Sequence, residues 1–200
     1  MKRNLVLMVM SVITVILMSG CNKIPQTEID AANQALNEAK SSGAELYLPD
    51  YYNQTMDSLN AVVVKLESKK SKWFASYSDE KSKLEDVRLM ATQLKENTEV
   101  RKNEIKNEIQ NTLTEMKQTL EENKQLLTQA PQGKEGKAAL EAIKEEMGML
   151  EASIDEVMNL IASEQYLEAQ NKVNVSNEKV LAINMELKNA IAKSSRKGHK

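Results

Sequence analysis

Apolar side chains recur every three or four residues through most of the chain, and this spacing places them on one face of an α-helix. Prolines, glycines and short polar runs interrupt the pattern and mark where helices begin and end. The pattern therefore predicts an all-α fold of about five helices. They cover residues 27–42, 49–74, 78–128, 135–161 and 166–193.

The predicted helix at residues 78–128 is the longest stretch without glycine or proline. In each half, the residues expected to face a partner helix follow one another at steps of three and four and form a stripe. Residues 95–104 between the halves are almost wholly polar, and the register of the stripe shifts by one residue across them. Two sets of packing partners, one for each half, would explain the shift. The stripes comprise Leu84, Val87, Ala91, Leu94 and Thr98, then Ile109, Leu113, Met116, Leu120, Asn123 and Leu127.

We therefore expect an elongated antiparallel helical bundle or coiled coil, made of two three-helix sub-bundles that share the long helix. The N-terminal bundle covers residues 27–103, and a C-terminal hairpin packed on the long helix covers residues 104–193. The stripes of the other helices comprise Ile29, Ala32, Leu36 and Ala39; Met56, Leu59, Val63 and Leu66; Leu140, Ile143, Met147, Leu150, Ile154, Val157 and Ile161; and Tyr166, Ala169, Val173, Ser176, Val180, Ile183, Leu187 and Ala190.

The first 21 residues have the order of a secretory signal. Lys2 and Arg3 precede an apolar run at residues 5–18, and small residues separate this run from Cys21. An apolar helix of that length spans about 21 Å, less than the roughly 30 Å hydrocarbon core of a bilayer, so a permanent membrane span is disfavoured. An uncleaved N-terminal anchor and an unmodified, buried thiol are the alternatives.

The run Leu17-Met18-Ser19-Gly20-Cys21 resembles a bacterial lipoprotein signal peptide. The resemblance implies that residues 1–20 are removed and that Cys21 becomes an N-terminus carrying diacylglyceryl and N-acyl lipid, with palmitate among the acyl groups. This covalent lipid is the only cofactor expected, and residues 21–26 form the lipidated tether. Because Asn22 stands where Asp is associated with retention at the inner membrane, the resemblance implies the periplasmic face of the outer membrane. The outer face of the plasma membrane is the alternative.

The segment Gly43-Ala44-Glu45-Leu46-Tyr47-Leu48-Pro49 separates the first two predicted helices. It resembles the Gly-Ala-x-x-Tyr-x-Pro turn of an uncharacterised family of helical bacterial envelope lipoproteins, with Leu48 in place of the small residue usual before the proline. The resemblance covers about residues 27–95. It implies two antiparallel helices and a location in the envelope, and it implies no reaction.

The turn at the end of the second predicted helix, at residues 72–77, holds the only tryptophan and the only phenylalanine of the chain. An antiparallel bundle returns this turn to the membrane end, and aromatic rings beside lysines suit a lipid interface. We therefore expect a second membrane contact; the alternative is that Trp73 and Phe74 plug the open end of the bundle while the lysines are solvated. The contact would comprise Lys69, Lys70, Lys72, Trp73, Phe74 and Tyr77.

Residues 194–200 form a polar, basic tail that we expect to be disordered. A lipid at one end and Lys200 at the other give a layout similar to that of the murein lipoprotein, whose C-terminal lysine is joined to the cell wall. This similarity implies a peptidoglycan contact through Lys200. A tail that only aids solubility is the alternative.

Composition argues against several function classes. The formal net charge is only −2 and the two signs alternate along the chain, which disfavours a nucleic-acid binder. His199 is the only histidine, and no glycine-rich phosphate loop occurs, so we expect neither an enzyme nor a metal site. The methionines are expected to fill the core rather than to form a cofactor site. They include Met116, Met147, Met149, Met158 and Met185.

The leading function is a lipid-anchored helical scaffold that binds another envelope protein along an exposed groove, or that associates with itself. A structural link between membrane and peptidoglycan is the first alternative. A carrier of lipid or another small ligand is the second.

Overall fold

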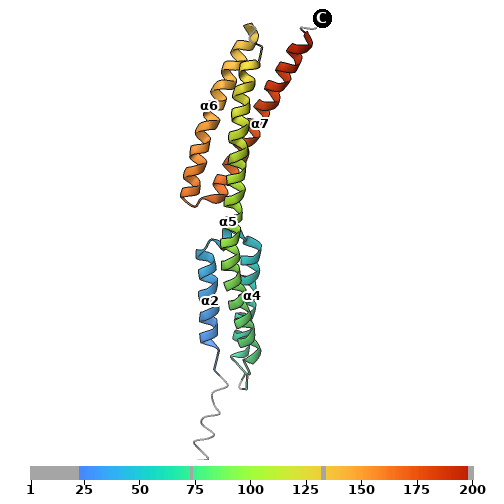
Figure 1. Cartoon of the computed structure of the whole chain (residues 1–200). Coiled ribbons are helices and arrows are strands. Elements are labelled where there is room, and N and C mark those ends of the chain that lie inside the picture. The colour runs from blue at the N-terminus through green and yellow to red at the C-terminus, as the bar shows by residue number, and fades with distance from the viewer. Residues whose placement is uncertain (1–22, 73, 132–133, 198–200) are drawn as a thin grey trace, which may run out of the picture. The chain divides into compact units, whose positions relative to one another are not determined.

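The computed structural model describes residues 23–72, 74–131 and 134–197. Over these residues the chain is an all-α bundle without strands, as the stripes predict (Figure 1). The helices are α2 (Gln26–Ser41), α3 (Ala44–Tyr47), α4 (Pro49–Lys69), α5 (Ser78–Gln129), α6 (Lys134–Ala162) and α7 (Tyr166–Lys197).

The chain forms two compact units, and helix α5 belongs to both. The N-terminal unit, Met1–Arg101, holds α2, α3, α4 and the first part of α5. The C-terminal unit, Lys102–Lys200, holds the rest of α5 with α6 and α7. Each unit therefore has three long helices, of which α5 is shared, and the division falls between residues 101 and 102. Helix α5 remains helical through the polar residues 95–104.

In the N-terminal unit, α2 and α5 bury their expected faces, whereas the buried face of α4 is rotated. Met56 and Val63 are only half-buried. Because positions 62 and 63 are both valine, the sequence did not show which of the two residues belongs to the buried face of α4. Thr55 enters the core because its hydroxyl donates a hydrogen bond to the Tyr51 carbonyl at 2.8 Å. The buried residues of α4 are Tyr52, Thr55, Leu59, Val62 and Leu66.

A short helix, α3, replaces the open turn expected before Pro49. Gly43 has a left-handed backbone conformation, with φ of 94°, and ends α2 as expected. Ala44 is fully buried, and the Leu48 N–H donates to its carbonyl at 2.9 Å. One turn of helix thus satisfies backbone groups beside the core, and Pro49 then begins α4.

Helix α4 ends at Lys69, five residues earlier than expected. Ala75 and Tyr77 are both buried against the core of the N-terminal unit. The helix must end after Lys69 for these two side chains to reach the core. This is a tertiary requirement, and the helix propensity of residues 70–74 does not reveal it.

Helix α7 continues through Lys197, so the expected disorder of the tail is wrong for residues 194–197. The Ser195 hydroxyl donates to the Ile191 carbonyl at 3.0 Å, and the first helix-breaking residue is Gly198. Residues 198–200 lie outside the described part of the chain.

The hairpin of α6 and α7 follows its expected stripes. Its turn closes through two backbone hydrogen bonds, from Glu164 to Ile161 at 3.1 Å and from Gln165 to Leu160 at 2.9 Å. Glu164 adopts a left-handed backbone conformation, with φ of 59°, at a position where no glycine marks it in the sequence. The buried stripe residues are Ile143, Met147, Leu150, Ile154 and Val157 on α6 and Ala169, Val173, Ser176, Val180, Ile183 and Leu187 on α7.

Two glycines of α6 should respond oppositely to the same substitution. A Cβ atom on Gly148 would meet nothing within 4 Å, so Gly148→Ala should stabilise the fold by about 0.5–1 kcal/mol. A Cβ atom on Gly136 would lie 2.6 Å from the Pro131 carbonyl oxygen, so Gly136→Ala should destabilise it by about 1–2 kcal/mol. Urea unfolding followed by circular dichroism measures both changes, and midpoints that move in the same direction would contradict this account.

Candidate functional site

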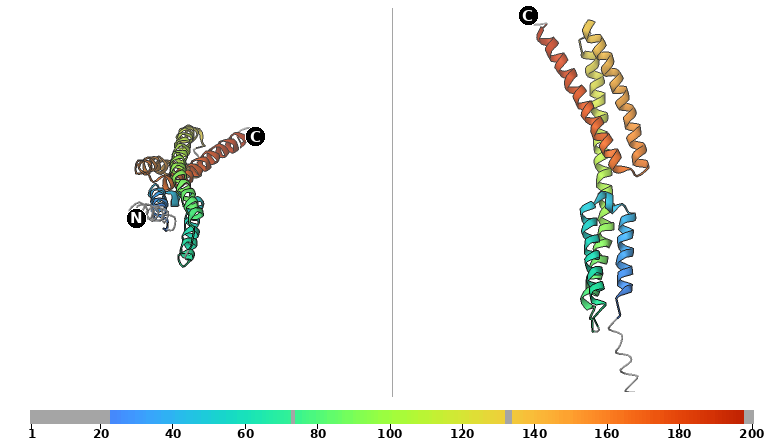
Figure 2. Two further views of the ribbon diagram at one scale, coloured as in Figure 1. Left: turned by 90° about the horizontal axis from the view of Figure 1, so that it is seen from below. Right: turned by 180° about the vertical axis from the view of Figure 1, so that it is seen from behind.

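One end of the N-terminal unit collects the residues expected to contact the membrane. We call it the base and define it as residues 23–28, 69–72 and 74–81. Helix α2 begins there, α4 ends beside it, and α5 begins there (Figures 1 and 2). The Lys81 ammonium lies 2.6 Å from Oε1 of Glu28, which brings the starts of α2 and α5 together. Its hydrogen bond lowers the pKa of the Glu28 carboxyl.

Lys69 and Tyr77, two of the expected contact residues, face the bundle. Lys69 Nζ lies 2.7 Å from Oε2 of Glu80, whose side chain is 4% exposed, and donates to the Ser76 carbonyl at 3.1 Å. The hydrogen bond from Lys69 lowers the pKa of the buried Glu80 carboxyl. Tyr77 packs in the core. Both side chains therefore hold the base together.

The other expected contact residues that the structure describes face solvent. Phe74 is 88% exposed, so the alternative in which it plugs the bundle is wrong. Lys70, directly after the end of α4, pairs with Glu67 in the last turn of that helix. Lys72 is exposed and has no acidic partner among the described residues. Trp73 lies outside those residues.

Cys21 and Lys200 also lie outside the described residues. The covalent lipid on Cys21 and the peptidoglycan contact of Lys200 therefore stay predictions. The first described residues after Cys21 are Lys23 and Ile24, and both belong to the base.

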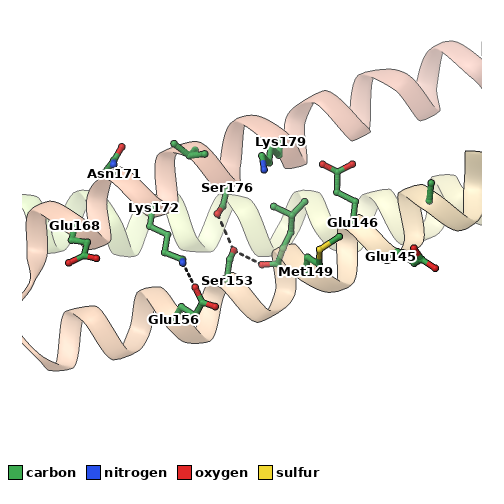
Figure 3. Close-up of a pocket in the computed structure, with 13 residues that line it drawn as sticks. Glu145, Glu146, Met149, Ser153, Glu156, Glu168, Asn171, Lys172, Ser176 and Lys179 are labelled. Carbon is green, nitrogen blue, oxygen red and sulfur yellow. Dashed lines mark hydrogen bonds and ion pairs between the residues drawn. The ribbon is translucent and has the colours of Figure 1, made fainter.

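A second surface lies between α6 and α7 in the C-terminal unit. The two helices meet near their turn and diverge away from it (Figure 1). Side chains of both helices line a groove of about 810 Å³ between them (Figure 3). We call it the α6–α7 groove. Its lining mixes charged, small and apolar side chains, including Glu145, Met149 and Ser153 of α6 and Lys172, Val175 and Lys179 of α7.

Polar contacts join the two walls of the groove at its narrow end (Figure 3). The hydroxyls of Ser153 and Ser176 are hydrogen-bonded at 3.0 Å, and Ser176 is almost fully buried. Lys172 forms an ion pair with Glu156 one turn nearer the hairpin. These contacts fix the narrow end and leave the opposite end open.

The methionines divide between core and surface. Met116 and Met147 are buried as expected, but Met149, Met158 and Met185 are 68%, 51% and 62% exposed, so the core prediction is wrong for these three. Met149 follows Met147 by two residues and thus falls outside the three-four stripe of α6. That offset was the sequence signal for a surface position.

The groove carries more acidic than basic groups. Glu145, Glu146 and Glu168 line it and have no basic partner in the described part of the chain. Lys179 on the opposite wall likewise has no acidic partner there. Met149 and Val175, which is 48% exposed, add apolar surface between these charges. A partner that brings basic side chains and an apolar stripe would complement this lining.

Among the described residues, no cluster of three or more histidine, cysteine, aspartate or glutamate side chains is placed to hold a metal ion. No helix in that part of the chain has the length and apolarity to cross a bilayer. No protein-family model, curated protein or solved structure matches this chain.

Proposed function

We propose that this chain is a lipid-anchored lipoprotein of the bacterial envelope that acts as a non-catalytic scaffold. Cys21 carries the lipid, at the periplasmic face of the outer membrane, and the α6–α7 groove receives a helix of another envelope protein. The groove is the observation that carries the proposal. The anchor is supported by the signal-like run that ends at Cys21.

The dimensions and lining of the groove suit a helix. Between Ala142 and Glu156 the α6 wall spans about 21 Å, or four turns. Two diverging helices offer ridges between which a third helix packs. Met149 adapts to different apolar partners because its side chain is flexible. The unpaired acids Glu145 and Glu146 would meet lysine or arginine side chains.

The same lining favours a polypeptide over a lipid or another small apolar ligand. A carrier site encloses most of its ligand in apolar walls. Here Met149 is open to solvent, and charged side chains stand on both walls. An acyl chain in the groove would keep one side exposed to water, and on its other side it would cover Glu146 and Lys179 without offering them a polar partner.

Site-specific photo-crosslinking in cells tests the proposal. A photoreactive residue at Met149 should trap a discrete partner. The matched control is Met185, which is similarly exposed but does not line the groove. The double substitution Glu145→Lys/Glu146→Lys should reduce trapping at Met149 by roughly tenfold, because it repels a basic partner.

Equal trapping at Met149 and Met185, or no trapping at either, would overturn the groove as a docking site. An adduct of twice the chain mass would identify the partner as a second copy of this chain. Mass spectrometry of the mature chain tests the anchor separately. A bare Cys21 would remove the lipid anchor and leave the crosslinking result unaffected.

A further inference from the structure

We propose that the base of the N-terminal unit is a second, non-covalent membrane contact, in which Phe74 inserts into the interface of an anionic bilayer while Lys23 and Lys72 face its headgroups. The orientation rests on the proposed lipid at Cys21. The recognition chemistry rests on the base itself.

Phe74 is exposed, whereas two residues close to it in the chain are buried. Ala75 and Tyr77 fill the core while Phe74, next to them in the chain, is 88% exposed. Backbone hydrogen bonds define the turn, from Lys72 to the Lys69 carbonyl at 3.0 Å and from Ala75 to the Lys72 carbonyl at 3.3 Å. The fold thus presents one large apolar ring outward, the arrangement that interfacial aromatic anchors use.

The charges around Phe74 complement an anionic surface. Lys23 and Lys72 are exposed and have no acidic partner among the described residues. The acids of the base are Glu28, which pairs with Lys81, the buried Glu80, and Asp79, which is exposed. Positive charge therefore prevails on the exposed surface. Each lysine close to an anionic bilayer strengthens binding about fivefold.

The covalent chain sets how far the base can lie from a lipid on Cys21. Ile24 packs against the core of the N-terminal unit and is three residues from Cys21. Three extended residues reach at most about 10 Å. A lipid at Cys21 therefore holds the bilayer surface close to the base, which is why a membrane, rather than a protein, is the expected occupant.

The only tryptophan of the chain, Trp73, precedes Phe74 and serves as a reporter. The mature lipidated chain is reconstituted into vesicles of phosphatidylglycerol and phosphatidylcholine, with or without bromine on the acyl chains. Bromine quenches tryptophan on contact, and we expect most of the Trp73 fluorescence to be lost in the brominated vesicles.

Binding of residues 22–200, which lack both the apolar run and Cys21, to the same vesicles measures the contact without the anchor. Phe74→Ala should weaken it about tenfold, and Lys72→Gln about fivefold. The matched control is Leu46→Ala. Leu46 is 64% exposed in α3, at the opposite end of the N-terminal unit, and its loss should leave binding unchanged.

Each outcome decides the proposal. Unquenched Trp73 in a chain whose mass confirms the lipid overturns the second contact and leaves the anchor standing. A chain that lacks the lipid overturns the anchor, and binding of residues 22–200 then decides the contact alone: binding that weakens with Phe74→Ala supports the contact, and no binding overturns it. Equal losses for Phe74→Ala and Leu46→Ala would also overturn it, because binding would not depend on the base.

Discussion

Replacing Lys69 with methionine should lower the unfolding free energy of the N-terminal unit by about 3 kcal/mol. The Glu80 side chain is 4% exposed and its carboxylate lies 2.7 Å from Lys69 Nζ. Without the ammonium, a buried negative charge loses its partner, and the Ser76 carbonyl loses the hydrogen bond it accepts at 3.1 Å. Methionine keeps most of the side-chain volume, so the loss reports the charge rather than a cavity.

The adjacent lysine provides the control. Lys70 pairs with Glu67, but both side chains are about half exposed, and such surface pairs contribute little. Lys70→Met should therefore leave stability nearly unchanged. Urea unfolding followed by Trp73 fluorescence reports on the N-terminal unit, to which this residue belongs in sequence. Equal losses for the two lysine variants would contradict a special contribution of the buried pair.

The ion pair of Lys69 and Glu80 should make the stability of the N-terminal unit depend on pH. The hydrogen bond from Lys69 lowers the pKa of Glu80 below its ordinary value of 4.5, although burial opposes the shift. A carboxyl whose pKa is lower in the folded state stabilises the fold above its unfolded pKa, and this stabilisation is lost as the pH falls through the folded pKa. The stability difference between the wild type and Lys69→Met should thus be full at pH 7 and shrink below about pH 4.5.

The helix stripes were predictable because they depend on local periodicity. Val173, Val180 and Leu187 are buried in α7 as the three-four spacing requires. Position 62 or 63 of α4 was ambiguous because both residues are valine, and only packing against α2 and α5 selects Val62. Periodicity locates the buried face of a helix to within one residue, and tertiary contacts determine which of two adjacent residues is buried.

At the base, too, the sequence predicted the local turn but not the tertiary contacts. The sequence identified the turn that holds Phe74 and its lysines, but not which of them face inward. Lys69 and Glu80 are eleven residues apart and meet only because α4 ends between them. Of the residues expected at the membrane contact, those that the structure describes as exposed are Phe74, Lys70 and Lys72, and Lys70 is paired with Glu67.

The groove could not be predicted from either helix alone. It depends on the angle between α6 and α7, which meet where the small residues Ser153 and Ser176 allow close approach. A heptad pattern sets which side chains face the partner helix, but the crossing angle follows from side-chain sizes along the whole contact. The stripe of α7 included Ser176 without revealing that it marks the narrow end.

Asn123 is fully buried in the stripe of α5 and is expected to fix how α5 and α7 align. Its Nδ2 donates to the Val180 carbonyl at 3.0 Å, and its Oδ1 accepts from Asn184 Nδ2 at 2.7 Å. Asn184 Nδ2 also donates to Glu122 Oε2 at 3.0 Å. Both polar atoms of the Asn123 amide and the Nδ2 atom of Asn184 are therefore partnered, and removal of Asn184 leaves the buried Oδ1 of Asn123 without its donor.

Asn184→Leu alone should destabilise the C-terminal unit by about 2–3 kcal/mol, because the buried Oδ1 of Asn123 would lose its donor. Asn123→Leu/Asn184→Leu should recover most of that loss, since two apolar side chains leave no unmade hydrogen bond between them. Asn174→Leu, at an exposed position of the same helix, is the control and should have little effect. Urea unfolding with hydrogen exchange of α7 peptides measures all variants. A double variant that loses the sum of the two single losses would show that the asparagines act independently, whereas recovery would show that their mutual hydrogen bond, rather than their burial, aligns the helices.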